Sequence, residues 1–363
     1  MMRISLYSRA GLLAFFLTTA FVMGWEVYWR SQGFELSYND DEPLWAFHRQ
    51  RIYQSTPAAP VLIGSSRIKF DIDLTTWEEA TGSTPTQLAL VGTSPRPVLT
   101  DLAQDENFKG TVVVGVTEPL FFSPSGGPFE RRAHSSVKFY PDWSLAQRAS
   151  FKINQALESR LLLLDEERFA LRFLLDRLNI PNRSGVFAIP PFPLHFTRNY
   201  FNRQTSVTDT FVADTVLQNQ QRQIWWNLFT TAPRMHRDDS TLTTIFEEVK
   251  ASVTKIQARG GKVLFVRMPS SGPIREMEKR DFPREEYWDR LLKETGATGI
   301  HFEDYPQLAQ YPCIEWSHLG PAEARAFTRN FIQIMQQKTG WPVQMVNAAS
   351  SSTVVSISIL TAH

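Results

Sequence analysis

The chain has 363 residues and a formal net charge of +1, and 42% of its residues are hydrophobic while 21% are charged. This length can bury a large core, and the composition is that of a folded protein rather than a disordered one. The near-zero charge gives no global field to attract nucleic acid, so we expect no nucleic-acid partner. The single cysteine, Cys313, excludes a disulfide within the chain, and we expect it to be a buried apolar residue.

The first apolar segment, residues 11–29, predicts a transmembrane anchor that follows a cytoplasmic N-terminus, residues 1–10. Positive charge at Arg3 and Arg9 predicts that the N-terminus stays inside and that the rest of the chain is extracytoplasmic, in the periplasm or on the outer face. Aromatic residues suited to the membrane interface stand at the two ends of the run: Tyr7, Trp25, Tyr28 and Trp29. The alternative is a cleaved signal peptide, which would also export the chain.

Five short apolar runs separated by helical segments predict the strands of one sheet. They are Val61–Gly64, Gln87–Val91, Thr111–Val116, Lys262–Met268 and Gly299–Phe302. This alternation predicts an α/β fold over residues 59–340, with a flavodoxin-like, three-layer α/β/α arrangement and a mostly parallel five-stranded sheet.

Helix start and stop signals place helices around these strands. The expected helices are Glu42–Tyr53, a segment from Pro95 or Pro97 to Asp105, Thr241–Arg259 with Gly260-Gly261 at its C-cap, and Pro321–Lys338. Residues 30–58 are expected to form a linker that contains the first of these helices. Residues 341–363 are expected to be a C-terminal tail, either an extra edge strand or a disordered end.

The stretch from residue 122 to residue 238 breaks the alternation of strands and helices. It contains an amphipathic helical pattern from Leu145 to Leu178, a proline-rich loop, and a second helical segment that ends at Ile224-Trp225-Trp226. We expect a helical insertion that lies over the ligand-binding edge of the sheet. A separate domain is the alternative.

Two short motifs carry the residue types of a nucleophilic site. Gly64-Ser65-Ser66 directly follows the first predicted strand, so its hydroxyls lie at the carboxyl end of the sheet, where ligands bind in α/β folds. Far downstream, Glu315 and His318 are three residues apart and offer a carboxylate that can orient an imidazole base. Serine, histidine and an acid together can form and resolve an acyl-enzyme.

These motifs resemble the SGNH/GDSL hydrolase superfamily. Gly64-Ser65-Ser66 is similar to its first block, usually Gly-Asp-Ser, and Glu315-Trp316-Ser317-His318-Leu319 is similar to its last block, usually Asp-x-x-His-Leu. The N-terminal anchor and the Gly-Ser-Ser form resemble the membrane-anchored, exported subgroup that accompanies polysaccharide O-acetylation and D-alanine transfer to teichoic acid. The resemblance covers residues 60–335 outside the insertion.

The resemblance implies a role for each matching residue. Ser66 would be the nucleophile, His318 the general base and acid, and Glu315 the acid that orients it. The oxyanion hole would use the backbone N–H groups of Ser66 and Gly92. Thr117 stands where the family has the oxyanion asparagine, and its hydroxyl would donate to the oxyanion from a shorter reach. This departure is compatible with a transferase or an inactive relative.

Residues after the fourth predicted strand are further candidates. Arg267, Ser270 and Arg275 are expected to bind substrate at the same sheet edge, with surface or turn roles as the alternative. Arg67, next to the predicted nucleophile, is expected to pair with Asp71 or Asp73. The sequence lacks His-Glu-x-x-His, paired Cys-x-x-Cys, a phosphate loop and a dinucleotide fingerprint, so we expect no metal and no cofactor.

The expected function is an exported, membrane-anchored serine acyl-transfer enzyme, an O-acyltransferase or esterase acting on a cell-surface or secreted polysaccharide. Its partners would be an acyl-ester or polysaccharide substrate, the membrane, and a membrane-bound acyltransferase that supplies the acyl group. A general exported esterase or lipase is one alternative. The other is a non-catalytic scaffold of a surface-polymer modification complex, in which Thr117 and Glu315 would mark a decayed site.

Overall fold

The computed structural model describes residues 6–54, 59–169, 175, 178, 191–231 and 239–341. The described chain has an α/β fold built on a five-stranded sheet in the order β2-β1-β3-β6-β7, and every pair of neighbouring strands is parallel. Its strands are β1 (Val61–Ile63), β2 (Thr86–Gln87), β3 (Thr111–Val116), β6 (Lys262–Arg267) and β7 (Thr298–His301). The predicted mostly parallel sheet is therefore confirmed.

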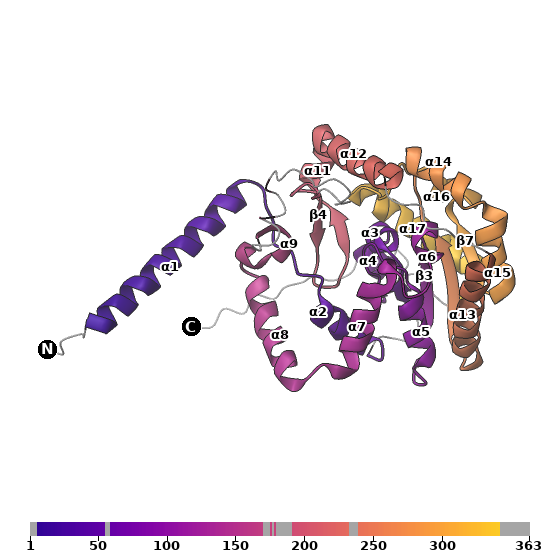
Figure 1. Ribbon diagram of the computed structural model, residues 1–363, viewed down its shortest axis with the longest axis horizontal. Coiled ribbons are helices and arrows are strands. Elements are labelled where there is room, and N and C mark those ends of the chain that lie inside the picture. Colours follow the sequence, from indigo (N-terminus) through magenta and orange to yellow (C-terminus); the bar gives the residue numbers. More distant parts are fainter. Residues whose placement is uncertain are drawn as a thin grey trace, which may run out of the picture.

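Helices pack on both faces of the sheet (Figure 1). Alternate residues of each strand face opposite sides, so Val61 and Ile63 lie in one apolar cluster and Leu62 lies in the other. The first cluster includes residues of α5 (Arg96–Gln104), α13 (Asp239–Ala258) and α15 (Arg290–Thr295), and the second includes residues of α3 (Ser66–Asp71), α4 (Leu74–Thr81) and α17 (Pro321–Thr339). Burial on both faces explains why these strands are continuous apolar runs.

The second strand is shorter than the sequence predicts. Only Thr86–Gln87 form β2, although Gln87–Val91 was the expected range. The chain nevertheless continues beside β1, because the Leu88 N–H donates to Leu62 O at 2.8 Å and the Leu90 N–H donates to Gly64 O at 3.0 Å. This extension brings Gly92 to the turn that follows β1.

The segment between β3 and β6 is mostly helical and also carries a two-stranded hairpin. Its elements are α6 (Glu118–Phe121), η1 (Pro128–Glu130), α7 (Arg131–Asp142), α8 (Leu145–Glu158), η2 (Leu162–Leu164), α9 (Glu166–Phe169), β4 (Thr197–Asn199), β5 (Thr205–Val207), α11 (Asp209–Ala213) and α12 (Thr215–Thr231). The single helix predicted from Leu145 to Leu178 is wrong. It ends at Glu158, because Leu162 turns inward to pack with Phe34 and Phe169, and most of residues 170–178 lie outside the described chain.

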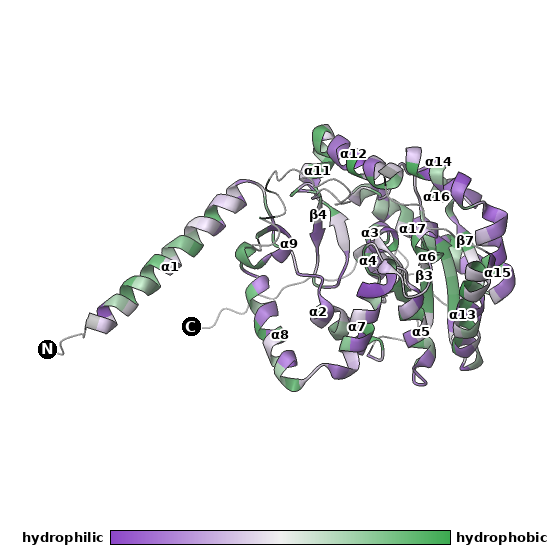
Figure 2. Cartoon of the chain, viewed as in Figure 1, coloured by the Kyte–Doolittle hydropathy of each residue, from purple (hydrophilic) through white to green (hydrophobic). Residues whose placement is uncertain are grey.

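The N-terminal helix α1 (Leu6–Ser31) is long and apolar enough over Tyr7–Ser31 to cross a membrane, and it is the one such helix among the described residues. Figure 2 shows apolar residues along most of its length, and Figure 1 shows it projecting from the body. Its last turns contact the body, where Trp25 and Trp29 pack against Phe169 and Glu26 Oε1 accepts a hydrogen bond from the Leu163 N–H at 3.0 Å. The body is thus held at one end of the apolar helix.

The segment after α1 packs into the body, and it includes α2 (Glu42–Arg51), close to the predicted helix. Asp40 is buried and pairs with Lys69 at 2.5 Å, Arg203 at 2.8 Å and Arg132 at 3.0 Å. Burial opposes ionisation of Asp40, but these three positive charges outweigh it and hold the pKa of the carboxyl far below its usual range. Arg203 also donates to Gln87 O at 2.7 Å, so one ion cluster joins the linker, α3, the hairpin and the sheet edge.

The last third of the chain follows the predicted pattern. After β6 come α14 (Gly272–Asp281), the π-helical turn η3 (Glu285–Asp289), α15, β7, η4 (Phe302–Asp304), α16 (Pro306–Ala309) and α17. The predicted helix Pro321–Lys338 corresponds to α17, whose C-cap is Gly340 with φ of 62°. The loop between α16 and α17 carries Glu315 and His318.

Candidate active site

The turn between β1 and α3 requires glycine at position 64. A Cβ on Gly64 would lie 2.5 Å from Ile68 Cγ2 and 3.2 Å from the Gly115 backbone, which is closer than side chains pack. The strand ends at Ile63 and α3 begins at Ser66, so the turn is as short as the sequence predicts. Ser65 and Ser66 therefore stand at the carboxyl end of β1, next to the end of β3.

The two serines of this turn differ in their surroundings. Ser65 is buried, and its Oγ is hydrogen-bonded to Thr117 Oγ1 at 2.7 Å. Ser66 is half-buried, and among the described residues its hydroxyl makes no side-chain hydrogen bond. Of the two hydroxyls, that of Ser66 is the one free to react with a substrate.

Glu315 and His318 form the predicted acid–base pair. His318 Nδ1 donates to Glu315 Oε1 at 2.5 Å, and both side chains are buried. A carboxylate only accepts, so the hydrogen is on Nδ1 and the lone pair of the neutral ring is on Nε2. Nε2 is buried and has no hydrogen-bond partner among the described residues. The imidazole is thus oriented as a base with its reactive nitrogen unoccupied.

A tight turn brings Glu315 and His318 together. The Ile314 N–H donates to His318 O at 2.8 Å, and Trp316 between them has a positive φ of 78°, which is uncommon outside glycine. The Ser271 N–H holds this turn by donating to Trp316 O at 2.9 Å. A Cβ on Gly272 would lie 2.8 Å from Trp316 Cδ1, so glycine at 272 makes room for the indole ring.

The same turn packs along α3, the helix that starts with Ser66. The His318 ring stacks on Phe70 with centroids 4.2 Å apart, and Phe70 is one helical turn after Ser66 on the same face of α3. The Leu319 N–H donates to Asp71 Oδ1 at 2.9 Å. Ser66 and His318 are not hydrogen-bonded to each other in this structure. The structure nevertheless brings the predicted nucleophile, base and acid to one edge of the sheet.

The predicted oxyanion residues lie at the same edge. Gly92 is exposed and has a φ of 67°. It follows the extended segment whose Leu90 N–H is hydrogen-bonded to Gly64 O. Thr117 follows the last residue of β3 and is bonded to Ser65. If Ser65 donates in that bond, the Thr117 O–H is left to donate to another acceptor. Their roles toward an oxyanion stay predictions.

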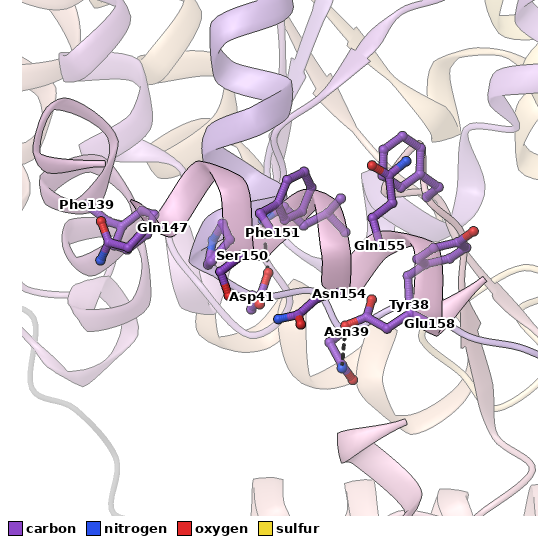
Figure 3. Close-up of a pocket in the computed structure, with 13 residues that line it drawn as sticks. Tyr38, Asn39, Asp41, Phe139, Gln147, Ser150, Phe151, Asn154, Gln155 and Glu158 are labelled. Atoms are coloured by element: carbon purple, nitrogen blue, oxygen red, sulfur yellow. Dashed lines mark hydrogen bonds between the residues drawn. The ribbon is translucent and has the colours of Figure 1, made fainter. Parts of the chain in front are cut away.

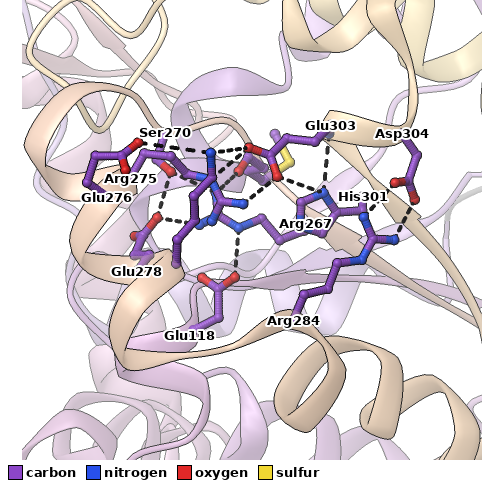
Figure 4. A network of polar contacts seen from close by, with 12 residues as sticks. Glu118, Arg267, Ser270, Arg275, Glu276, Glu278, Arg284, His301, Glu303 and Asp304 are labelled. Atoms are coloured by element: carbon purple, nitrogen blue, oxygen red, sulfur yellow. Dashed lines mark hydrogen bonds and ion pairs between the residues drawn. The ribbon is translucent and has the colours of Figure 1, made fainter.

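Arg267, Ser270 and Arg275 already have carboxylate partners within the protein (Figure 4). Arg267 is fully buried, donates to Glu118 Oε1 at 2.8 Å and also binds Glu278. Ser270 donates to Glu278 at 2.6 Å, and Arg275 donates to Glu303 at 2.9 Å. A role for them in substrate binding stays a prediction.

Arg67 does not pair with Asp71 or Asp73 as predicted. Its partner is Glu278, at 2.5 Å, which also holds Arg267. Burial opposes ionisation of Glu278, but the two guanidinium groups outweigh it and lower the pKa of the carboxyl to about 2. The sequence could not indicate this pair, because Glu278 lies on α14, more than 200 positions away.

Three aromatic residues around His318 were not predicted as part of the site. Phe70, Phe196 and Trp225 have ring centroids 4.2, 6.2 and 6.3 Å from the imidazole. Trp225, on α12, also donates its indole N–H to Glu315 Oε2. The insertion therefore contributes directly to the surroundings of His318. The only sequence signal was the aromatic composition of the insertion itself.

Two other side chains of this region are buried, and for Cys313 this confirms the prediction. Cys313 is buried, and burial raises the pKa of its thiol well above the usual value, as expected of an inert packed residue. His301 is also buried, packed between Trp288 and Phe302. Burial and the nearby Arg267 lower the pKa of His301 to about 3, so it is neutral at physiological pH.

A cavity of about 150 Å³ lies elsewhere, between α2, α7 and α8 (Figure 3). Asp41 and Glu158 are among its lining residues, and burial raises their pKa values to about 6 and about 7. None of the candidate catalytic residues lines it. A second cavity, of about 170 Å³, is lined in part by Phe70 and Leu319 and so lies next to the His318 turn.

No known family model matches the chain, and no curated protein matches it. The case for a function therefore depends on the geometry of the site.

Proposed function

We propose that the protein is a serine acyl-transfer enzyme of the SGNH type, with Ser66 as nucleophile, His318 as general base and acid, and Glu315 as the orienting carboxylate. One observation supports this above all others. The buried Glu315 carboxylate accepts from His318 Nδ1 at 2.5 Å and so fixes the tautomer, while Nε2 has no partner in the described part of the chain. The turn that carries this pair packs against the helix that Ser66 begins. Buried polar atoms are rarely left unpaired without a reason.

The chemistry follows from these positions. Ser66 Oγ attacks the carbonyl carbon of an acyl ester while His318 Nε2 takes the hydroxyl proton. Collapse of the tetrahedral intermediate breaks the bond to the leaving alcohol, and His318 returns the proton to it. A hydroxyl of the acceptor, or water, then attacks the acyl-enzyme through the same imidazole and regenerates Ser66. Glu315 stabilises the imidazolium in both steps.

The fold supports this proposal. Counted along the chain, the sheet strands have the spatial order 2-1-3-4-5, which is that of flavodoxin-like, three-layer folds. Such folds bind ligands outside the carboxyl ends of the strands. Ser66 and Thr117 follow the carboxyl ends of β1 and β3, which are paired neighbours in the sheet.

The N-terminal helix supports a location at the membrane. We propose that α1 is a single-pass anchor that holds the catalytic body on the extracytoplasmic side, since Arg3 and Arg9 precede the apolar run of residues 11–29. The proposed acceptor is a cell-surface or secreted polysaccharide. A membrane-bound acyltransferase is the proposed source of the acyl group.

Covalent labelling tests the catalytic part of the proposal. Intact-mass analysis of the full-length protein in detergent should show one fluorophosphonate adduct, and the S66A variant should show none. The S65A variant is the matched control, because it removes the adjacent hydroxyl and keeps Ser66. Labelling that persists in S66A, or no labelling of the wild type, would contradict the proposal and favour a non-catalytic scaffold.

A further inference from the structure

Gln221, on α12, has a buried side-chain amide with no partner. The residue is fully buried, and neither Oε1 nor Nε2 has a hydrogen-bond partner among the described residues. Burying both ends of a primary amide without partners costs folding free energy, so such a group calls for an explanation. Gln218, one turn earlier, shows the ordinary case, since its Nε2 donates to Val212 O at 2.9 Å and Phe211 O at 3.2 Å.

Gln221 shares one face of α12 with residues that contact the surroundings of His318. Leu217, Gln221 and Trp225 are spaced four residues apart and share one face of the helix. Leu217 packs against the apolar cluster that contains Phe70 and Phe196, and Trp225 binds Glu315. The residues on either side of Gln221 along this face thus both contact the surroundings of His318.

His318, which lies beside Trp225, carries another unpaired polar atom. Phe70, Phe196 and Trp225 surround its ring, and among the described residues its Nε2 has no hydrogen-bond partner. In Figure 1, α12 crosses the top of the body. Gln221 is therefore one helical turn before Trp225, whose ring lies beside His318 and whose indole N–H binds Glu315.

We propose that Gln221 binds the acyl acceptor, and that this acceptor is a carbohydrate whose neighbouring hydroxyls pair with both ends of the amide. The proposal rests on the serine acyl-transfer function. One hydroxyl donates to Oε1 while the next accepts from Nε2, so the two unsatisfied atoms are paired together. Aromatic faces nearby can pack on the apolar C–H face of a sugar ring. Gln221 would then select a sugar hydroxyl over water as the group that attacks the acyl-enzyme.

Partition of the acyl-enzyme tests this role. p-Nitrophenyl acetate transfers its acetyl group to Ser66 Oγ and releases p-nitrophenol. The acetyl group then passes either to water, giving acetate, or to methyl glucoside, giving its acetyl ester. The ratio of acetyl glucoside to acetate is measured for the full-length protein in detergent. Loss of two hydrogen bonds in Q221L should lower this ratio roughly tenfold or more.

Thermal stability separates a binding role from a structural one. Q221L should raise the Tm, because it removes an unpaired buried amide. The matched variant Q218L should lower the Tm, because it removes the hydrogen bonds to Phe211 O and Val212 O. Below its Tm, the Q218L partition ratio should stay within about twofold of the wild type, since that amide is already paired within the protein.

The outcomes separate failure of this assignment from failure of the proposed function. If p-nitrophenol release does not depend on Ser66, the proposed function itself is wrong. If release depends on Ser66 but the wild type forms no acetyl glucoside, the carbohydrate assignment is overturned. An unchanged ratio in Q221L, or a Tm that falls as it does in Q218L, would show that Gln221 is structural.

Discussion

The indole N–H of Trp225 donates to one oxygen of the Glu315 carboxylate while Nδ1 of His318 donates to the other. Glu315 is fully buried, so these two donors and the protein around them replace its hydration. The hydrogen bonds run from α12, in the insertion, to the imidazole in the loop before α17. The insertion thus helps to set the orientation of the carboxylate that in turn orients His318.

The variant W225F should lower kcat about tenfold for Ser66-dependent ester hydrolysis. The change leaves one buried carboxylate oxygen without its donor, a loss of about 1–3 kcal/mol. Steady-state hydrolysis of p-nitrophenyl acetate measures the change in kcat.

The neighbouring tryptophan provides a matched control for this prediction. Trp226 follows Trp225 on α12 and is 49% exposed. W226F should leave kcat close to that of the wild type. Equal effects of the two variants would show that α12 contributes through general packing rather than through the Trp225 hydrogen bond.

The parallel sheet was predictable because its signal is local. Runs such as Val112-Val113-Val114 are buried on both faces, and this requirement is visible in the sequence without knowledge of the partner. The Gly64 turn was predictable for a similar reason, since a short strand followed by small residues indicates a tight connection. The predicted range of the second strand was too long. The residues after Gln87 make strand-like hydrogen bonds to Leu62 and Gly64 but are not part of the regular strand β2.

The pairing of distant side chains was not predictable in the same way. Nothing near Glu278 indicates that its carboxylate holds both Arg67 and Arg267, and nothing near Trp225 indicates contact with Glu315. These contacts depend on how loops fold back over the sheet edge. A motif placed Glu315 and His318 in the site, whereas the residues that enclose them carry no motif.

The variant T117V should lower kcat by about two orders of magnitude with a smaller change in KM, if the Thr117 hydroxyl donates to the oxyanion. Valine keeps the shape of the threonine side chain and removes its hydroxyl, the group that would donate to the oxyanion. Pre-steady-state acylation by p-nitrophenyl acetate measures the effect on the first chemical step.

The Ser65 hydroxyl offers the control for Thr117. S65A keeps the Thr117 hydroxyl but removes its 2.7 Å partner, so the donor is present but less well oriented. We expect the kcat of S65A to be about tenfold lower than that of the wild type, which is a smaller loss than that of T117V. A T117V enzyme as active as the wild type would exclude Thr117 from the oxyanion hole.

The variant E278Q should be strongly destabilised. Glu278 and Arg267 are both buried, and Arg67 shares the same carboxylate, so loss of the negative charge leaves Arg67 without its carboxylate partner and Arg267 with Glu118 alone. The free energy of unfolding should fall by about 3–5 kcal/mol. Thermal or urea unfolding of the detergent-solubilised protein measures the change.

The Arg275–Glu303 pair allows comparison with a more exposed ion pair nearby. Glu303 is 31% exposed, so E303Q should cost at most about 1 kcal/mol. A similar cost for both variants would mean that the Glu278 cluster is hydrated, and that its arginines are more accessible to a substrate than their burial indicates.

The variant D71N should change how stability depends on pH. Burial raises the pKa of the Asp71 carboxyl well above its usual value, against the opposing effects of the Leu319 N–H and Arg67, and Oδ2 has no partner among the described residues. The native protein therefore binds this proton more tightly than the unfolded chain does. The stability that this tighter proton binding contributes is fully present below about pH 4. It is lost as the pH rises toward the native pKa, and the free energy of unfolding then falls by up to about 1.4 kcal/mol per pH unit. Asparagine keeps the acceptor for Leu319 and cannot ionise, so the Tm of D71N should increasingly exceed that of the wild type as the pH rises above 5. Parallel curves for the two proteins would show that Asp71 keeps an ordinary pKa and that solvent reaches it.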